Sequence, residues 1–215
     1  MISKWQDFFI DRVKSTPFVP LTRRDMEYCV TLEAHTSLEK YIHFYCHEGA
    51  GCFWTVISMI FNPKTIVEFG TANGATTNLL AKLNPSAIIY SIDHIGWAGT
   101  ADSATGFLAK ANENVNLIME NSREFECKDV GLCFIDADHS KESVLSDSRR
   151  AWKNRNVKGD WCIIWDDYDW ESVKEAVDQF VSEVKWELQF TGKSPIIGTK
   201  AMDEFNNLVK ERRTT

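Results

Sequence analysis

The fold of this chain is decided by the stretch Thr65-Ile66-Val67-Glu68-Phe69-Gly70-Thr71-Ala72-Asn73-Gly74-Ala75-Thr76-Thr77. An apolar run ends in an acid, glycines spaced among small residues follow, and an apolar pattern of helical spacing comes next. This order predicts a strand, a tight turn and a helix in a single βα unit. Glycines at the turn allow the backbone to bend sharply and to approach a ligand closely.

A second acidic residue indicates what that ligand contains. Asp93 ends the apolar run 87–92, and it lies 23 positions after Gly70. A strand-end carboxylate meets a ribose hydroxyl at a separation of about 20. The turn has no third glycine of the kind that a dinucleotide site needs. Glu68 would repel a pyrophosphate but could accept a hydrogen bond from a cationic ammonium, which favours S-adenosylmethionine over NAD.

The composition limits the classes of partner. The chain has 215 residues, 44% of them hydrophobic, with 24 basic and 31 acidic residues and a net charge of −7. This length favours one domain, and the negative charge disfavours nucleic acid and favours a small-molecule partner. Six cysteines without a CxxC pair predict reduced thiols in a cytoplasmic protein. We expect no membrane insertion, because no apolar run approaches ~18 residues, and we leave a homo-oligomer open.

The pattern of apolar residues predicts three parts within a single domain, 1–215. Residues 1–62 carry helical periodicity and predict an N-terminal helical extension, which Asn62-Pro63 ends. We expect these helices to cover the acceptor pocket. Residues 63–201 predict the cofactor-binding α/β core, and residues 202–215 a C-terminal helix or tail.

Strands and helices alternate in the predicted core. Apolar runs typical of buried parallel strands lie at 65–69, 87–92, 115–119, 130–135 and 161–165. Helices are predicted at 76–83, 101–112 and 141–152, and along an apolar stripe from Val173 to Val184. Two short runs, 186–191 and 195–200, predict a closing hairpin.

The motifs resemble those of a known family. Residues 68–74 resemble motif I of class I S-adenosylmethionine-dependent methyltransferases, and Asp93 resembles their ribose-binding acid. Residues 134–142 and 163–168 are similar to the branch of catechol O-methyltransferases, cephalosporin hydroxylases and macrolide-sugar O-methyltransferases. The resemblance implies an α/β fold with a Rossmann-like seven-stranded, mostly parallel sheet, an antiparallel last strand and helices on both faces. One departure is Ala72, where motif I has its middle glycine.

The resemblance also implies which residues bind the cofactor. Those expected at its methionine end are Glu68, Gly70, Thr71 and Gly74, with the following helix N-terminus near its carboxylate. Asp93 is expected to hold the ribose. Ser122, which follows the third strand, is expected at the adenine, although a plain loop serine fits the pattern equally well.

An acidic cluster is predicted beside this site. Asp136 ends the fourth predicted strand and Asp166-Asp167 end the fifth, so the three carboxylates should gather at one sheet edge. Their mutual repulsion raises their pKa values unless a cation joins them, and carboxylates suit Mg²⁺, Ca²⁺ or Mn²⁺. In the family, such a metal lowers the pKa of a substrate hydroxyl. Alternatively, Asp166 or Asp167 only caps a helix or faces water.

His139 completes the candidate set. We expect Asp136 and His139 to be catalytic, with His139 as general base or as a partner of Asp136, although a structural histidine fits as well. The sequence thus predicts an O-methyltransferase for a small hydroxylated molecule that uses S-adenosylmethionine and a divalent cation such as Mg²⁺. Two alternatives stay open: a non-catalytic nucleoside-binding or scaffold subunit with this fold, and a cephalosporin-hydroxylase-like protein.

Overall fold

The computed structural model describes residues 54, 57–58, 61–94, 105–191 and 194–199. Apart from residues 54, 57 and 58, these residues belong to the unit Ile60–Thr215. The predicted N-terminal extension lies almost wholly outside the described residues, and the C-terminal tail lies outside them entirely. Both parts, and the single-domain organisation, therefore stay predictions. No helix within the described ranges is long and apolar enough to cross a membrane.

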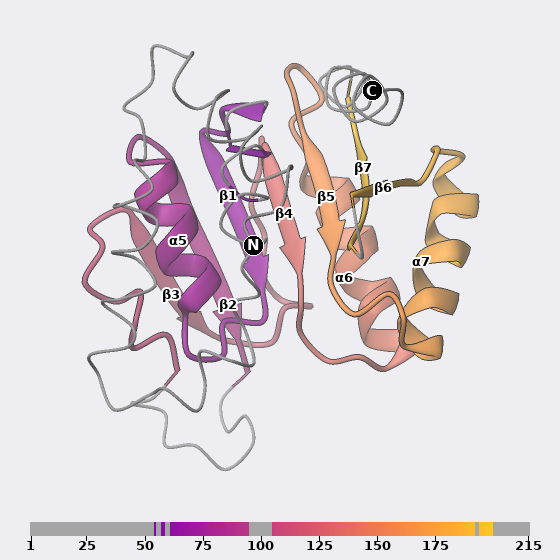
Figure 1. The fold of residues 1–215 in the computed structure, drawn as a ribbon, viewed down its shortest axis with the longest axis horizontal. Coiled ribbons are helices and arrows are strands. Elements are labelled where there is room, and N and C mark those ends of the chain that lie inside the picture. The colour runs from indigo at the N-terminus through magenta and orange to yellow at the C-terminus, as the bar shows by residue number, and fades with distance from the viewer. Residues whose placement is uncertain (1–53, 55–56, 59–60, 95–104, 192–193, 200–215) are drawn as a thin grey trace, which may run out of the picture. The chain divides into compact units, whose positions relative to one another are not determined.

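A seven-stranded sheet in the order β3-β2-β1-β4-β5-β7-β6 forms the centre of this unit (Figure 1). The parallel strands are β1 (Thr65–Phe69), β2 (Ile88–Asp93), β3 (Val115–Met119), β4 (Leu132–Ile135) and β5 (Cys162–Trp165). The chain then forms β6 (Gln189–Thr191) and β7 (Ser194–Gly198), which pair as a hairpin, and β7 runs antiparallel to β5. The predicted fold class is confirmed, including the antiparallel last strand.

The strand order reverses at β1, which pairs with β2 on one side and with β4 on the other. Phe69 is in register with Ile92 and with Ile135, and Ile135 is in register with Trp165. The carboxyl ends of these four strands therefore lie side by side. Ligands of open α/β sheets bind at this edge, where the strand order reverses.

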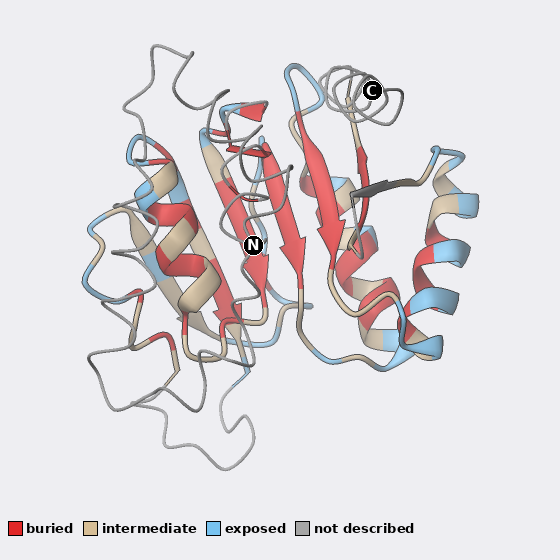
Figure 2. Cartoon of the chain, viewed as in Figure 1, coloured by how far each residue is buried: buried red, intermediate tan, exposed pale blue. Residues whose placement is uncertain are grey.

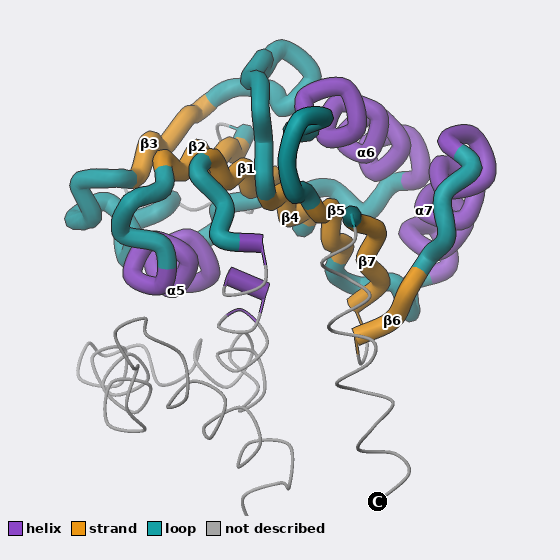
Figure 3. The backbone as a smooth tube through the Cα atoms, turned by 90° about the horizontal axis from the view of Figure 1, so that it is seen from above, coloured by secondary structure: helices purple, strands orange, loops and turns teal. Residues whose placement is uncertain are grey.

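Helices cover both faces of the sheet (Figure 3). On one face lies α5 (Ala75–Leu83), and on the other lie α6 (Lys141–Asn154) and α7 (Glu171–Val184). Figure 2 shows that the central strands and the inward sides of the helices are buried. Two-sided burial explains why these strands are nearly continuous apolar runs rather than alternating ones.

The helix predicted at 101–112 is wrong in its described part, because residues 105–111 form turns. Gly106 has a φ of +67°, which a helix does not allow. Its N–H donates to the carbonyl of Ala72 at 2.8 Å, and the N–H of Leu108 donates to the carbonyl of Asn73 at 3.1 Å. Two amides of the segment thus bond to the glycine turn instead of to a helix of their own.

Candidate cofactor and metal site

The glycine turn after β1 is shaped by close backbone contacts. Gly70 has a φ of +98°, and a Cβ there would lie 1.9 Å from the carbonyl oxygen of Asp136. Gly74 has a φ of +83°, and its Cβ would lie 2.9 Å from the Cα of Gly106. Only glycine fits such a conformation without strain. The turn therefore lies directly against the loop that follows β4.

Gly74 is also the N-cap of α5, where a ligand carboxylate is expected. It makes no side-chain capping bond, and no acidic residue occupies the first turn of the helix. Amide groups at such a helix start favour an anion. The N–H of Ala75 already donates to Asn73 Oδ1 at 3.0 Å, and the methionine carboxylate at this helix start stays a prediction.

Glu68 lies beneath the turn, with only 1% of its surface exposed. Its carboxylate accepts hydrogen bonds from Ser91 Oγ at 2.5 Å and from Thr77 Oγ1, and Thr71 Oγ1 lies 2.7 Å from the same Ser91 oxygen. Burial, more than the nearby charge of Asp93, raises the pKa of Glu68 to about 7. Through these bonds Glu68 of β1 is linked to Ser91 of β2 and Thr77 of α5, and through Ser91 to Thr71 of the turn. Its contact with a cofactor ammonium stays a prediction.

Asp93 ties the end of β2 to the same turn. One carboxylate oxygen accepts the N–H groups of Thr71 at 3.0 Å and Ala72 at 2.8 Å, and the other accepts the N–H of His94 at 2.7 Å. An ionised carboxylate has about four acceptor positions. Asp93 thus keeps about one position for a ribose hydroxyl, as its predicted role requires.

The acidic cluster forms at the ends of β4 and β5. His139 Nε2 lies 2.9 Å from an oxygen of Asp167 and 3.8 Å from an oxygen of Asp136. One ligand atom from each residue lies within 4.8 Å of the others, a spacing that can hold a cation. Although the distance to Asp167 is short, the buried Nε2 has no hydrogen-bond partner among the described residues. Two carboxylates and an imidazole nitrogen suit a divalent cation.

Electrostatics also favour a cation in this cluster. Burial, followed by the charges of Asp166, Asp167 and Glu68, raises the pKa of Asp136 to about 8. Burial raises the pKa of Asp166 as well. The structure gathers Asp136 and Asp167 with His139, while Asp166 is not in the group of three. Metal binding by any of these residues stays a prediction.

Trp170 covers one side of His139. The two rings are tilted by 33° with centroids 4.7 Å apart, and 54% of the tryptophan is exposed. By contrast, Trp165 is fully buried and donates to Ser148 Oγ at 2.9 Å, so it is a core residue. Trp170 is therefore the aromatic side chain that borders the cluster on the described part of the chain.

The side chain of Ser122 lies near Asp147 of α6 and lowers the pKa of its carboxyl group, which burial raises to about 6. Its adenine contact stays a prediction, and a hydroxyl that both donates and accepts can make it. Asp147 is only 2% exposed, and we did not single it out from the sequence. The spacing of α6 could have identified it, because Asp147 lies three positions after Val144 and four before Ala151. These positions share the buried side of the helix.

Comparisons with known proteins agree with this geometry. Residues 67–168 match the model of a methyltransferase domain family. No curated protein sequence matches the chain significantly. Among solved structures, an SAH-bound methyltransferase from Podospora anserina is 13% identical, with a TM-score of 0.59, covering 91% of this chain and 95% of that one. An O-methyltransferase from Bacillus cereus in complex with SAH is 16% identical, with a TM-score of 0.58, covering 92% of this chain and 99% of that one.

A third similar structure is a SAM-dependent O-methyltransferase from Thermotoga maritima, 13% identical with a TM-score of 0.54, covering 79% of this chain and 69% of that one. At identities of this size the similar structures establish the fold alone. The relation to methyltransferases rests on the match to the family model. Residues 67–168 thus match a methyltransferase domain, and this match together with the fold supports an S-adenosylmethionine-dependent methyltransferase.

Proposed function

We propose that the protein transfers the methyl group of S-adenosylmethionine to a hydroxyl oxygen of a small molecule, with a divalent cation at Asp136, His139 and Asp167. The observation that carries this proposal is the contact between the two sites. The glycine turn at Gly70 lies against the backbone of Asp136, so the cofactor edge and the cluster are neighbours. Proximity of donor and acceptor is the main contribution to such an in-line displacement.

Each group in the cluster has a role that follows from its position. A bound cation would supply positive charge that lowers the pKa of an acceptor hydroxyl. Asp136 and Asp167 would hold that charge, and their own repulsion would be relieved by it. His139 Nε2, which has no hydrogen-bond partner in the described part of the chain, could instead take the acceptor proton. The tilted ring of Trp170 would limit the directions from which an acceptor can approach.

Cofactor binding is tested by calorimetric titration of the full chain with S-adenosylhomocysteine, with and without Mg²⁺. Asp93→Ala should weaken binding by about 1.5–3 kcal/mol, because it removes charge-assisted hydrogen bonds. Asp169→Ala, at an exposed acid away from the turn, is the matched control. Equal affinities for Asp93→Ala and the wild type would contradict the nucleoside assignment.

Transfer is tested with S-adenosylmethionine labelled in its methyl group and a panel of hydroxylated acceptors, including catechols and nucleotide sugars. We expect label in a product, loss of transfer in EDTA and recovery with Mg²⁺. Full transfer in EDTA would contradict a role for the cation and would leave His139 as a general base that needs no metal. Tight S-adenosylhomocysteine binding without transfer to any acceptor would instead favour a binding subunit.

A further inference from the structure

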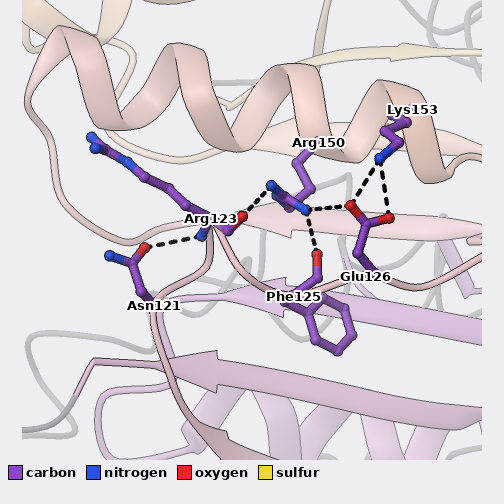
Figure 4. A network of polar contacts seen from close by, with 6 residues as sticks. All are labelled: Asn121, Arg123, Phe125, Glu126, Arg150 and Lys153. Carbon is purple, nitrogen blue, oxygen red and sulfur yellow. Dashed lines mark hydrogen bonds and ion pairs between the residues drawn. The ribbon is translucent and has the colours of Figure 1, made fainter.

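The loop that follows β3, residues 120–126, is held by side chains of α6 (Figure 4). We call this segment the β3 loop. From α6, Arg150 donates through Nη1 to the carbonyl of Phe125 at 2.7 Å and through Nη2 to the carbonyl of Arg123. Nη1 also meets the carboxylate of Glu126 at 3.0 Å. One guanidinium thus bonds to three residues of the β3 loop.

Asp147, one helical turn before Arg150, makes the other contact. Asp147 is 2% exposed, and the nearby side chain of Ser122 lowers the pKa of its carboxyl group. Arg123 and Arg150 are the cations near it, and burial raises its pKa to about 6 in spite of them. A buried acid in a core position costs stability unless its partners compensate.

The position of the β3 loop explains why it needs such support. β3 is the edge strand of the sheet, so its chain has a neighbouring strand on one side only. The carbonyl of the buried Phe125 needs a donor, and the Arg150 side chain, 19% exposed, supplies it. The same helix begins just after the loop that carries Asp136 and His139, with Ser140 as its N-cap.

We propose that Asp147 and Arg150 are positioning residues that set the nucleoside end of the cofactor site by fixing the β3 loop to α6. The inference rests on the proposed function, in which Ser122 of this loop meets the adenine. Neither residue needs to touch the cofactor. Their removal should weaken the contact with adenine and ribose, and should not depend on the amino-acid end of the cofactor.

The test is calorimetry of the full chain at pH 7.5 with two probes: S-adenosylhomocysteine, and methylthioadenosine, which lacks the amino-acid end. The variants are Asp147→Asn, which keeps the shape, and Arg150→Met, which keeps the apolar stem. We expect each variant to bind both probes about tenfold more weakly, the loss of roughly one hydrogen bond to a charged group. Arg149→Met is the control, because Arg149 donates to Glu183 of α7, away from the loop.

A double-mutant cycle separates positioning from general destabilisation. Ser122→Ala and Asp147→Asn should be non-additive in the affinity for methylthioadenosine, because they break the same contact. Additive losses, or losses seen with S-adenosylhomocysteine alone, would overturn the inference. Wild-type affinities in folded Asp147→Asn and Arg150→Met would overturn it too. Absence of binding by the wild-type chain would instead refute the proposed function.

Discussion

Asp136 is expected to destabilise the folded protein when no cation is bound. Folding raises its pKa from 3.8 to about 8. Because the folded state binds the proton more tightly than the unfolded chain, stability falls as the pH rises above about 3.8 and levels off above about 8. At pH 7, about three pH units above 3.8, the charge of Asp136 lowers the free energy of unfolding by up to about 4 kcal/mol, at ~1.4 kcal/mol for each unit. Asp136→Asn removes this charge.

At pH 7, Asp136→Asn should therefore raise the free energy of unfolding by about 2–4 kcal/mol. The lower figure allows for solvent screening around the Asp136 side chain, which is 27% exposed. The assay is urea unfolding in EDTA at pH 7 and pH 5. At pH 5 the gain should shrink to about 1–2 kcal/mol, since the pH is only about one unit above 3.8.

Asp169→Asn is the control for net charge, since Asp169 is exposed in the same loop, and it should change stability by less than about 0.5 kcal/mol. Mg²⁺ should stabilise the wild type and leave Asp136→Asn nearly unchanged. A variant less stable than the wild type in EDTA, or equally stabilised at both pH values, would refute the reasoning.

Three further changes test other parts of the site. Gly70→Ala should lower the free energy of unfolding by at least ~2 kcal/mol, measured in urea, because its Cβ would lie 1.9 Å from a carbonyl oxygen. Thr77→Val should cost about 1–3 kcal/mol at pH 8 and less at pH 6, because the pKa of Glu68, its acceptor, is about 7. Trp170→Ala should shift the imidazole proton resonances of His139 in NMR spectra, while Trp170→Phe keeps part of the ring-current effect.

Most of the fold was predictable because the local signals and the tertiary structure agree. The strands at 65–69 and 115–119 occur with the predicted bounds. The fourth strand begins two residues later than predicted, at Leu132, because Asp129 has a φ of +56° and Val130 pairs only as an isolated bridge with Arg155. A positive φ at a non-glycine residue gives no apolar signal, so the pattern could not show it.

The cofactor side of the site was predictable for a geometric reason. Gly70 and Asp136 follow β1 and β4 directly, and Asp93 is the last residue of β2. The three strands are in register at these ends, so their order along the chain already places the three residues together. Asp147 was not predictable in this way. Its partner Ser122 lies 25 residues before it, and an acid on a helix is usually solvated.

The sequence could not tell which of two adjacent aspartates after β5 joins the cluster. Asp166 and Asp167 follow the same strand, so the sequence could place both at the sheet edge without telling which one lies against His139. The backbone of Asp167 decides it, since a φ of +48° turns the chain there and brings its carboxylate to His139. Aspartate tolerates this left-handed conformation better than most residues, yet it still carries strain. Strained backbone persists where the surrounding structure fixes it, often at functional sites. The irregular geometry at Asp167 is thus a second reason, independent of the pKa of Asp136, to seek the chemistry of this protein in the cluster.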